Sequence, residues 1–400
     1  MANSLLTIDM ITRKSLEILE NNLVISRNCN RQYDDSFAVQ GAKIGSTLRI
    51  RLPDRALVTD GAALQVQDDN EQYTTLSVAS QKHIGINFTS AELTMQLDDF
   101  AERVLKPRIS QLASSIDADV APAYKSIYNS VGTPGTTPGT SLVLLQAQQK
   151  LNEFATPMSP RYATVNPAAN AGLVEGMKGL FNPTDTVSRQ FKNGMMGTGV
   201  LGFDEINMSQ SIGMHTTGAW GTTITSTGTL STQGQATLPI SFTGSSKTWK
   251  QGDVFTIAGV YAVNPQTRQS TGSLQQFVVT ADLTASSTGT LSISPAIYTA
   301  DHALATVDSF PQATAVVTML GSASTQYAQN LSYHKDAITL ATADLLLPQG
   351  VDMASRQTHN GISMRIVRQY DINNDRMPCR VDVLYGYAAI RPSMATRIWG

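Results

Sequence analysis

The feature of the sequence that most restricts its fold is one long apolar stripe between residues 91 and 131. Apolar side chains recur there at steps of three and four, namely Leu97, Ala101, Val104, Leu105, Ile109, Leu112, Ile116, Val120, Tyr124, Ile127 and Tyr128. This spacing predicts one amphipathic helix of nearly forty residues, kinked at Pro107 and Pro122. Because such a helix exceeds the common length of roughly 8–20 residues, other elements must pack along it as along a spine.

The stretch between about 216 and 325 differs in composition from the rest of the chain. Residues 201–300 hold 32 serines and threonines but only 7 charged residues, whereas residues 1–100 hold 22 charged residues. Short apolar runs at 237–240, 254–260, 277–279 and 291–293 alternate there with glycine-rich and hydroxyl-rich turns. The pattern predicts a small all-β barrel or sandwich, inserted into a host of mixed helices and strands.

Shorter patterns predict the elements of the host. We expect a helix over 141–155, a strand over 161–165 and, after the turn at Asn166-Pro167, a helix over 169–179. Alternation of Leu48, Ile50 and Leu52 with polar neighbours predicts a strand at the start of a long two-stranded excursion. The fold class is therefore α+β.

Charge and hydropathy exclude several classes of function. The formal net charge is −2 over 400 residues, and only 15% of them are charged. This charge balance argues against a protein that coats nucleic acid by bulk electrostatics and against a polybasic membrane binder. No apolar run reaches the roughly 18 residues of a membrane span. Serine and threonine, 80 in all, replace the missing charges. Such a surface is cheap to desolvate, which suits a chain that buries its outside against copies of itself.

Cysteines and histidines form no reactive or metal-binding pattern. Cys29 and Cys379 lie far apart without a CxxC partner, and a reducing compartment is the default. The histidines, without any i, i+4 pair, are His83, His215, His302, His334 and His359. We expect no metal, no cofactor and no catalytic residue, and therefore not an enzyme.

The segment Gly197–Gly202 matches the dinucleotide fingerprint GxGxxG. That site needs a buried strand before the glycines and a long helix after them, so that the helix N-terminus meets the pyrophosphate. Neither pattern flanks this segment. A turn before an edge strand is the favoured interpretation.

Arg49, Arg51 and Arg55 place two or three cations on one face of a predicted strand. Nucleic-acid contact is one interpretation, but no aromatic residues interleave with them. The interpretation we favour is ion pairing with acids of another subunit. The candidate acids of that neighbour are Asp68, Asp69 and Glu71.

The order of these elements, together with several short motifs, resembles the major capsid proteins of tailed phages with the HK97-type fold, and most closely the P22 coat protein family. The motifs are Cys379-Arg380, Tyr385-Gly386 and Arg391-Pro392 near the C-terminus, Gly202-Phe203-Asp204-Glu205 before the insertion, Gly252-Asp253 and Ala258-Gly259-Val260 within it, and Tyr162 with Asn166-Pro167. The resemblance covers essentially the whole chain.

The resemblance implies a division of the chain into named parts. These are an N-terminal arm helix at 1–42, an extended two-stranded loop at 43–90, the spine helix and peripheral domain at 91–140, a first axial part at 141–215, the inserted all-β barrel at 216–325, and a second axial and peripheral part with the C-terminal strand at 326–400.

The resemblance also implies a function. The chain would form hexamers and pentamers of an icosahedral capsid around double-stranded DNA, through a scaffolded procapsid that expands on packaging. Partners would be other copies, a scaffolding protein, a portal protein at one vertex and DNA bound without specificity. Acids on the N-terminal helix, Asp9, Glu17 and Glu20, are the candidate scaffold contacts. The protein would be a virion component assembled in the bacterial host cytoplasm.

Two other classes of function stay open at this point. One is another self-assembling phage structural protein, such as a tail or shell component. The other is a nucleotide-binding enzyme built on Gly197–Gly202.

Overall fold

The computed structural model describes residues 8–34, 47–53, 55–58, 61–62, 66, 72–88, 101–176, 197–228, 230–372 and 376–400. The described residues fall into two compact units, each made of separate stretches of sequence. Unit 1 takes its residues from 1–50, 73–120 and 339–388, and unit 2 from 51–72, 121–338 and 389–400. Each unit is described by itself below.

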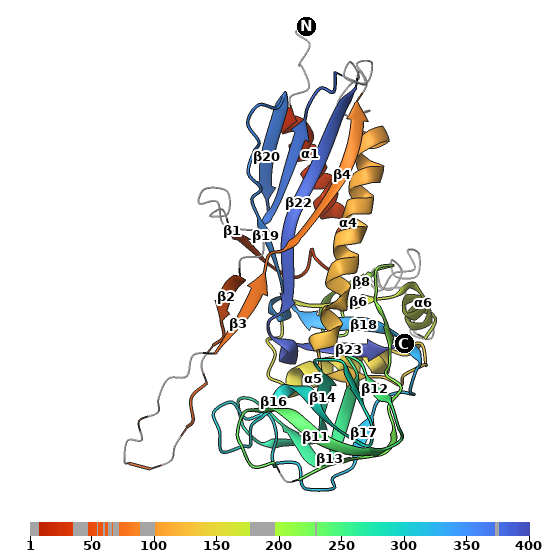
Figure 1. Ribbon diagram of the computed structural model, residues 1–400, viewed down its shortest axis with the longest axis vertical. Helices are drawn as coiled ribbons and strands as arrows, with labels where there is room; N and C mark the ends of the chain where they lie inside the picture. The colour runs from red at the N-terminus through yellow and green to blue at the C-terminus, as the bar shows by residue number, and fades with distance from the viewer. Residues whose placement is uncertain are drawn as a thin grey trace. The chain divides into compact units, whose positions relative to one another are not determined.

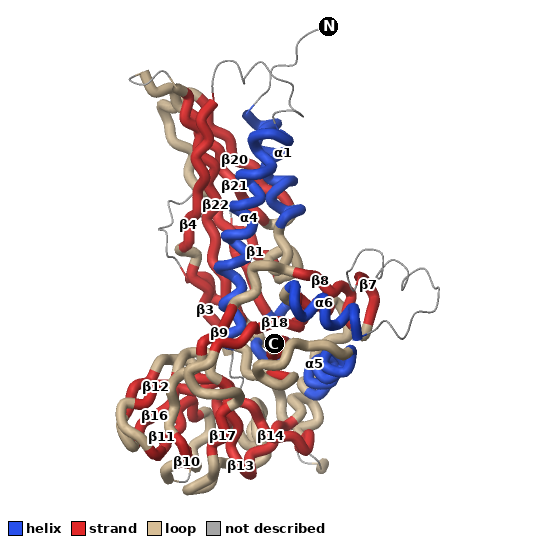
Figure 2. The backbone as a smooth tube through the Cα atoms, turned by 90° about the vertical axis from the view of Figure 1, so that its right-hand side faces the viewer, coloured by secondary structure: helices blue, strands red, loops and turns tan. Residues whose placement is uncertain are grey.

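The main sheet of unit 1 has two helices on one of its faces (Figures 1 and 2). The strands run in the order β1 (Asn30–Asp34), β19 (Ile338–Ala343), β22 (Met377–Ala389), β21 (Ile362–Arg368) and β20 (Met353–His359), and β4 (Ser80–Phe88) also pairs with β22. The helices are α1 (Ile8–Asn22) and α4 (Lys106–Val120). Their apolar stripes supply the core with buried leucines and isoleucines, such as Leu16, Leu19, Ile109, Leu112 and Ile116.

The predicted spine helix is shorter than its apolar stripe. A π-helical turn at Ala101–Leu105 leads into α4, and the α-helix ends at Val120, where a 3-10 turn over Ala121–Ser126 replaces it. Pro107 lies in the first turn, where its missing N–H costs little, but Pro122 would remove a hydrogen bond from the interior of a continuing helix. The prediction of one helix reaching residue 131 is therefore wrong at its C-terminal end, and residues 91–100 lie outside the described residues.

Unit 2 contains a second sheet, in the order β5 (Ser130–Val131), β23 (Ala395–Trp399), β18 (Gln326–His334), β6 (Arg161–Val165), β8 (Phe203–Met208) and β7 (Gly197–Val200). Helix α5 (Ser141–Glu153) and strand β6 confirm two of the predicted elements. The helix after Asn166 is α6 (Pro167–Gly176). Asn166 Oδ1 accepts a hydrogen bond from the Ala169 N–H, so asparagine caps the helix and proline occupies its first position.

The inserted segment of unit 2 is a six-stranded barrel. Its strands are β10 (Thr222–Ser226), β11 (Gln235–Thr243), β16 (Thr288–Ile297), β14 (Ser270–Val279), β13 (Val254–Val263) and β17 (Val317–Met319), in that order. A bridge between Thr225 and Val316 brings the two outer strands together, which leaves little open edge. The four short apolar runs predicted as strands lie in β11, β13, β14 and β16.

The two ends of the insertion lie side by side. Strand β9 (Met214–Thr216) enters it, and it pairs antiparallel with the start of β18, where Thr216 is opposite Gln326. About a hundred residues therefore leave and rejoin the host sheet at neighbouring positions. A domain placed between two paired strands does not disturb the sheet that carries it.

Gly386 of β22 allows two backbones of unit 1 to approach closely. A Cβ at this position would collide with the Ser77 carbonyl, whereas a Cβ at Gly85 of the neighbouring β4 would meet nothing within 4 Å. We expect Gly386→Ala to lower the free energy of unfolding by about 1–3 kcal/mol, as overpacking does elsewhere. Urea unfolding of unassembled subunits measures it, with Gly85→Ala as the matched control. Equal effects of the two substitutions would contradict this account.

Candidate assembly surfaces

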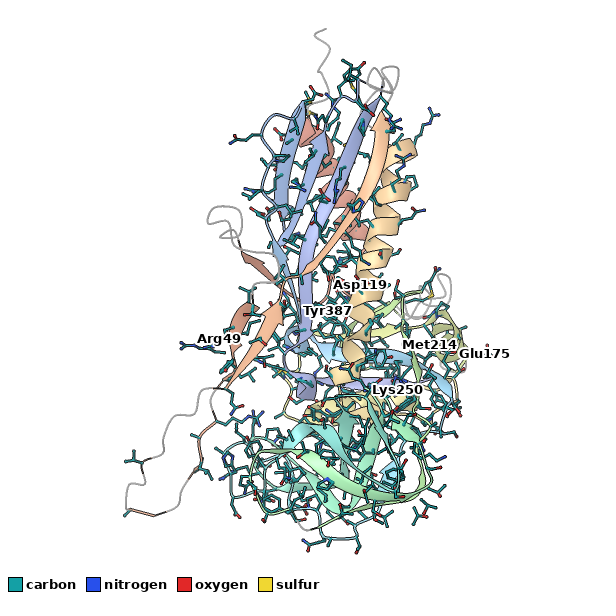
Figure 3. All side chains as sticks on the ribbon, viewed as in Figure 1. Arg49, Asp119, Glu175, Met214, Lys250 and Tyr387 are labelled. Carbon is teal, nitrogen blue, oxygen red and sulfur yellow. The ribbon has the colours of Figure 1, made fainter. Side chains whose placement is uncertain are left out.

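The two-stranded ribbon of β2 (Thr47–Arg51) and β3 (Tyr73–Ser77) has one covered and one uncovered face. Leu48 and Ile50 pack against a small cluster that includes Leu76. Residues 47, 49 and 51 alternate with them and are exposed. Figure 3 shows Arg49 projecting away from the ribbon. Its guanidinium lies 4.6 Å from the centre of the Tyr73 ring, which holds the cation without neutralising its charge.

The structure separates the three predicted interface arginines. Arg49 and Arg51 share the exposed face of β2, as the alternation predicts. Arg55 lies beyond the strand, where it lines a cavity of about 80 Å³ together with Tyr128, Phe154 and other residues of unit 2. The proposed partner acids Asp68, Asp69 and Glu71 lie outside the described residues.

The acids of α1 are mostly engaged within their own subunit. Asp9 accepts a hydrogen bond from the Ser355 hydroxyl. Glu20 accepts hydrogen bonds from Arg31 and Asn360 at 3.0 and 2.8 Å. Partial burial raises the pKa of Glu20, but these hydrogen bonds outweigh it and hold that pKa below its usual value. Glu17 pairs with Lys14 at 3.2 Å, and 59% of its side chain is exposed, so its carboxylate is the most accessible of the three.

A buried carboxylate of α4 fixes the turn that follows α1. Asp117 is 2% exposed and accepts hydrogen bonds from Val24 N, Ser26 N and Ser26 Oγ at 2.6, 3.0 and 2.6 Å. Burial raises its pKa, and the three donors only partly oppose that shift. Sequence reasoning missed this residue, and the available signal was an acid directly beside Ile116 of the apolar stripe.

Lys82 of β4 also contacts α4. Its ammonium lies 2.7 Å from Asp119 and donates to the hydroxyl of Ser115 at 2.6 Å. Tyr385 of β22 donates its hydroxyl proton to the same Asp119, which Figure 3 labels beside α4. Burial, followed by this carboxylate, raises the pKa of Tyr385. The three elements β4, β22 and α4 therefore meet at one carboxylate.

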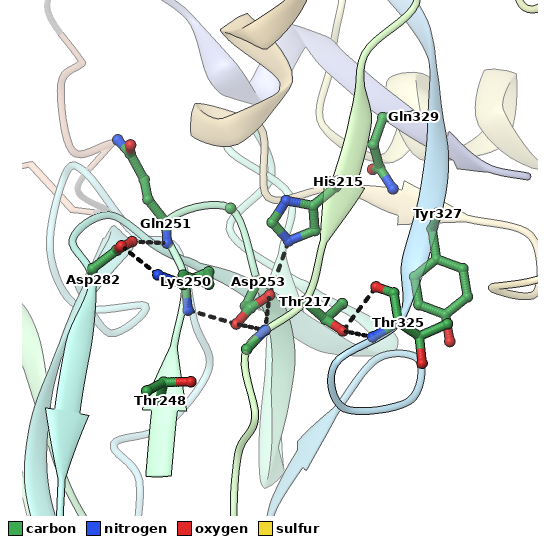
Figure 4. Close-up of polar contacts among 12 residues, drawn as sticks. His215, Thr217, Thr248, Lys250, Gln251, Asp253, Asp282, Thr325, Tyr327 and Gln329 are labelled. Carbon is green, nitrogen blue, oxygen red and sulfur yellow. Dashed lines mark hydrogen bonds and ion pairs between the residues drawn. The ribbon is translucent and has the colours of Figure 1, made fainter. Parts of the chain in front are cut away.

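A second polar cluster joins the barrel to the host sheet of unit 2 (Figure 4). Asp253 lies at the start of β13, fully buried, and its carboxylate is 2.9 Å from His215 Nε2 of β9. It also accepts from the backbone N–H groups of Lys250 and Gly218 at 2.8 and 3.1 Å. With Nε2 donating to Asp253, His215 Nδ1 can accept from the Tyr124 hydroxyl at 3.4 Å.

Arg397 of β23 completes this cluster from the C-terminal strand. The guanidinium is fully buried and donates to the carbonyls of Ile127 and Gly252 at 2.8 and 2.7 Å. It lies 5.2 Å from the centre of the Tyr124 ring. Burial lowers its pKa to about 9, and the nearby Tyr124 and Asp253 oppose the shift. One cation thus holds the segment after α4, the barrel and the last strand together.

The glycine motif has no nucleotide-binding geometry. Gly197–Val200 is strand β7, which pairs antiparallel with β8 through a turn at Leu201 and Gly202. Both turn residues have positive φ, 54° and 77°, as a tight hairpin requires. No helix opens after the glycines, so no helix N-terminus can face a pyrophosphate. The predicted turn is present at Leu201 and Gly202, but the edge strand β7 precedes this turn instead of following it.

The part of the chain that the structure describes contains no group of three or more histidine, cysteine or acidic side chains placed to hold a metal ion. It also contains no helix long and apolar enough to cross a membrane. Cys29 and Cys379 are both buried and unpaired.

The family model described as "P22 coat protein - gene protein 5" matches residues 1–400. The chain belongs to the P22 coat protein family. A major capsid protein of Acyrthosiphon pisum secondary endosymbiont phage 1 is 22% identical over 338 residues, which are 79% of each chain. A solved structure from Mycobacterium phage Che8 has 12% identity and a TM-score of 0.45, covering 94% of this chain and 90% of its own. The CUS-3 coat protein I-domain has 28% identity and a TM-score of 0.20, covering 25% of this chain and 96% of its own.

Family membership favours the capsid class among those left open by the sequence. The chain is a phage major capsid protein, and capsid proteins of this kind self-assemble into shells. Its fold is of the expected α+β class, with helices and sheets mixed in the host and an all-β insertion. The described surfaces of this coat protein are therefore candidate contacts between copies.

Burial of Asp117 makes the stability of the coat protein depend on pH. Because the folded pKa lies above the unfolded value near 3.8, the folded state binds the proton more tightly. The contribution of Asp117 is complete below the unfolded pKa and is lost as pH rises through the folded pKa. We expect the difference in unfolding free energy between wild type and Asp117→Asn to fall as pH rises from about 4, in urea titrations of unassembled subunits. A difference that rises with pH would show that the three donors outweigh burial.

Removing the buried cation of unit 2 should loosen the barrel from its host sheet. Arg397→Met leaves the buried carbonyls of Ile127 and Gly252 without their donor and removes the cation near Asp253, and the loss of such a buried partner costs about 3–5 kcal/mol. Thermal unfolding measures it. The control is Lys247→Met in the two-stranded ribbon of β12 (Lys247–Trp249) and β15 (Leu283–Ala285), where the lysine is half-buried and makes no ion pair with the described residues. It should change stability by less than about 0.5 kcal/mol. Similar losses for the two variants would contradict a special role of Arg397.

Proposed function

We propose that this coat protein forms the hexamers and pentamers of an icosahedral shell that encloses the double-stranded DNA genome. Shells would first assemble on a scaffolding protein in the bacterial host cytoplasm, with a portal protein at one vertex, and then expand as DNA enters. Membership of the P22 coat protein family supports this proposal. The expected lack of enzymatic activity is part of the same proposal, and the hairpin geometry of Gly197–Gly202 supports it.

The exposed face of β2 is the observation that carries the assembly proposal. A two-stranded ribbon is marginally stable in water unless something covers it. Within the subunit, the face of β2 that carries Leu48 and Ile50 packs against a small apolar cluster. Arg49 and Arg51 stay exposed on the opposite face. We propose that another copy covers this second face. Arg55 and the acids Asp68, Asp69 and Glu71 remain candidates for the same intersubunit contact.

Scaffold binding is proposed for α1. Of its three acids, Glu17 is the best placed, because Asp9 and Glu20 already hold α1 against Ser355, Arg31 and Asn360. A basic segment of the scaffold would therefore find one accessible carboxylate flanked by Lys14. This restricts the contact to a small part of the helix.

Charge reversal on the ribbon tests the proposal. We expect Arg49→Glu with Arg51→Glu to abolish shells but to leave the subunit folded, because both side chains are exposed. Negative-stain electron microscopy of the chain co-expressed with its scaffolding protein measures shell formation, and circular dichroism checks the fold. Arg49→Lys with Arg51→Lys keeps the charge and should still give shells. Uniform shells from the glutamate variant would contradict the proposal that another copy covers this face of β2.

A further inference from the structure

The cavity that Arg55 lines lies where the inserted barrel meets the rest of unit 2. Its volume is about 80 Å³. Pro295 and Ala305 line it from the insertion, whereas Tyr128 and Phe154 line it from the segments that follow α4 and α5. The content of this cavity therefore bears on how the barrel is held against its host.

One buried polar atom in the wall of the cavity lacks a hydrogen bond. Gln275 of β14 is fully buried and lines the cavity. Its Nε2 donates to the Gln276 carbonyl at 2.6 Å, which fixes the amide with Oε1 as the remaining acceptor. Among the described residues, no donor reaches this oxygen. A buried acceptor without a donor costs free energy, and a donor within the cavity would recover it.

The chemistry of the wall decides what that donor can be. A fully deprotonated anion has no proton to give to Gln275 Oε1, and a cation is disfavoured by the Arg55 guanidinium that lines the same cavity. A neutral organic ligand of ordinary size needs roughly 300–1,000 Å³. A water molecule both donates and accepts, and about 10–15 Å³ suffices for one. Water fits the charge and the size together.

We propose that this cavity is a binding site for a small cluster of ordered waters anchored on Gln275 Oε1. A buried water requires two to four polar partners. Besides Gln275, the wall includes the hydroxyl-bearing residues Tyr128, Thr306 and Ser393, which come from both sides of the junction. The waters thus connect the barrel to its host through hydrogen bonds that no side chain supplies directly. This site does not depend on the proposed shell formation.

X-ray hydroxyl-radical footprinting of unassembled full-length subunits tests the site. Radiolysis of an ordered water oxidises the side chains beside it, even where bulk solvent does not reach them. We expect Tyr128 and Phe154, which are 6% and 7% exposed, to be oxidised several times faster than Tyr124 and Phe242. These two controls are 3% and 5% exposed and are not among the residues that line the cavity. Mass spectrometry of the peptides measures the rates.

A variant that fills the cavity separates bound water from solvent that enters at its mouth. Ala305→Val takes up part of the space and should lower the oxidation of Tyr128 and Phe154 to the rates of the controls, with circular dichroism as the check of folding. If this variant does not fold, Gln275→Met replaces it, because it removes the anchoring acceptor, and the same fall is expected.

Two results would overturn the proposal. One is equal oxidation of the cavity residues and the controls in the wild type, which would mean that the cavity is dry. The other is undiminished oxidation of Tyr128 and Phe154 in a folded variant, which would mean that radicals arrive from bulk solvent. Since the subunits are unassembled, either result leaves the proposed shell formation untouched.

Discussion

The buried guanidinium of Arg397 is the interaction on which the organisation of unit 2 depends. A buried cation carries a large desolvation penalty, which only well-placed acceptors can offset. Here the acceptors come from segments far apart in sequence: the carbonyls of Ile127 and Gly252, with Asp253 nearby. The barrel, the segment after α4 and the C-terminal strand must therefore be in place together before this charge is satisfied. The polar cluster makes their folding cooperative, although apolar residues supply most of the buried surface.

The inserted barrel has fixed ends, its own core and little open edge. It can therefore be large although it holds few charged residues to prevent strand addition. Strand β9 leads into the barrel and β18 leads out, and their pairing keeps both ends fixed within the host sheet. Inside, a cluster of buried apolar side chains that includes Trp249, Phe255 and Phe277 forms a separate core. Because the barrel closes on itself, its hydroxyl-rich exterior need not be protected by charges against strand addition.

The spacing of apolar residues predicted the helices and strands that depend on local sequence. It failed for features that depend on contacts between residues far apart in the chain. The short apolar runs of the barrel and the strand and helix after residue 140 follow from spacing alone. The spine prediction overran because the apolar stripe continues past Pro122 while the α-helix ends at Val120. Asp117, Arg397 and Asp382 could not be predicted as central residues. Apart from Arg380, two positions from Asp382, their partners are 17 to 301 positions away in sequence. A single buried charge leaves no periodic signal.

The surfaces left uncovered share one chemical design that fits reversible assembly. The outer face of β2 and the open face of the unit 1 sheet each carry a partly engaged arginine. Arg49 lies on the Tyr73 ring, and the half-exposed Arg380 contacts Asp382. Apolar contact supplies attraction without direction, while the arginine accepts only a carboxylate in the correct position. A shell repeats each contact in every subunit, so each contact can be weak. Weak contacts dissociate when misplaced. If these arginines lie at contacts between copies, as proposed, we expect their charges to set the register of the copies more than the strength of the shell.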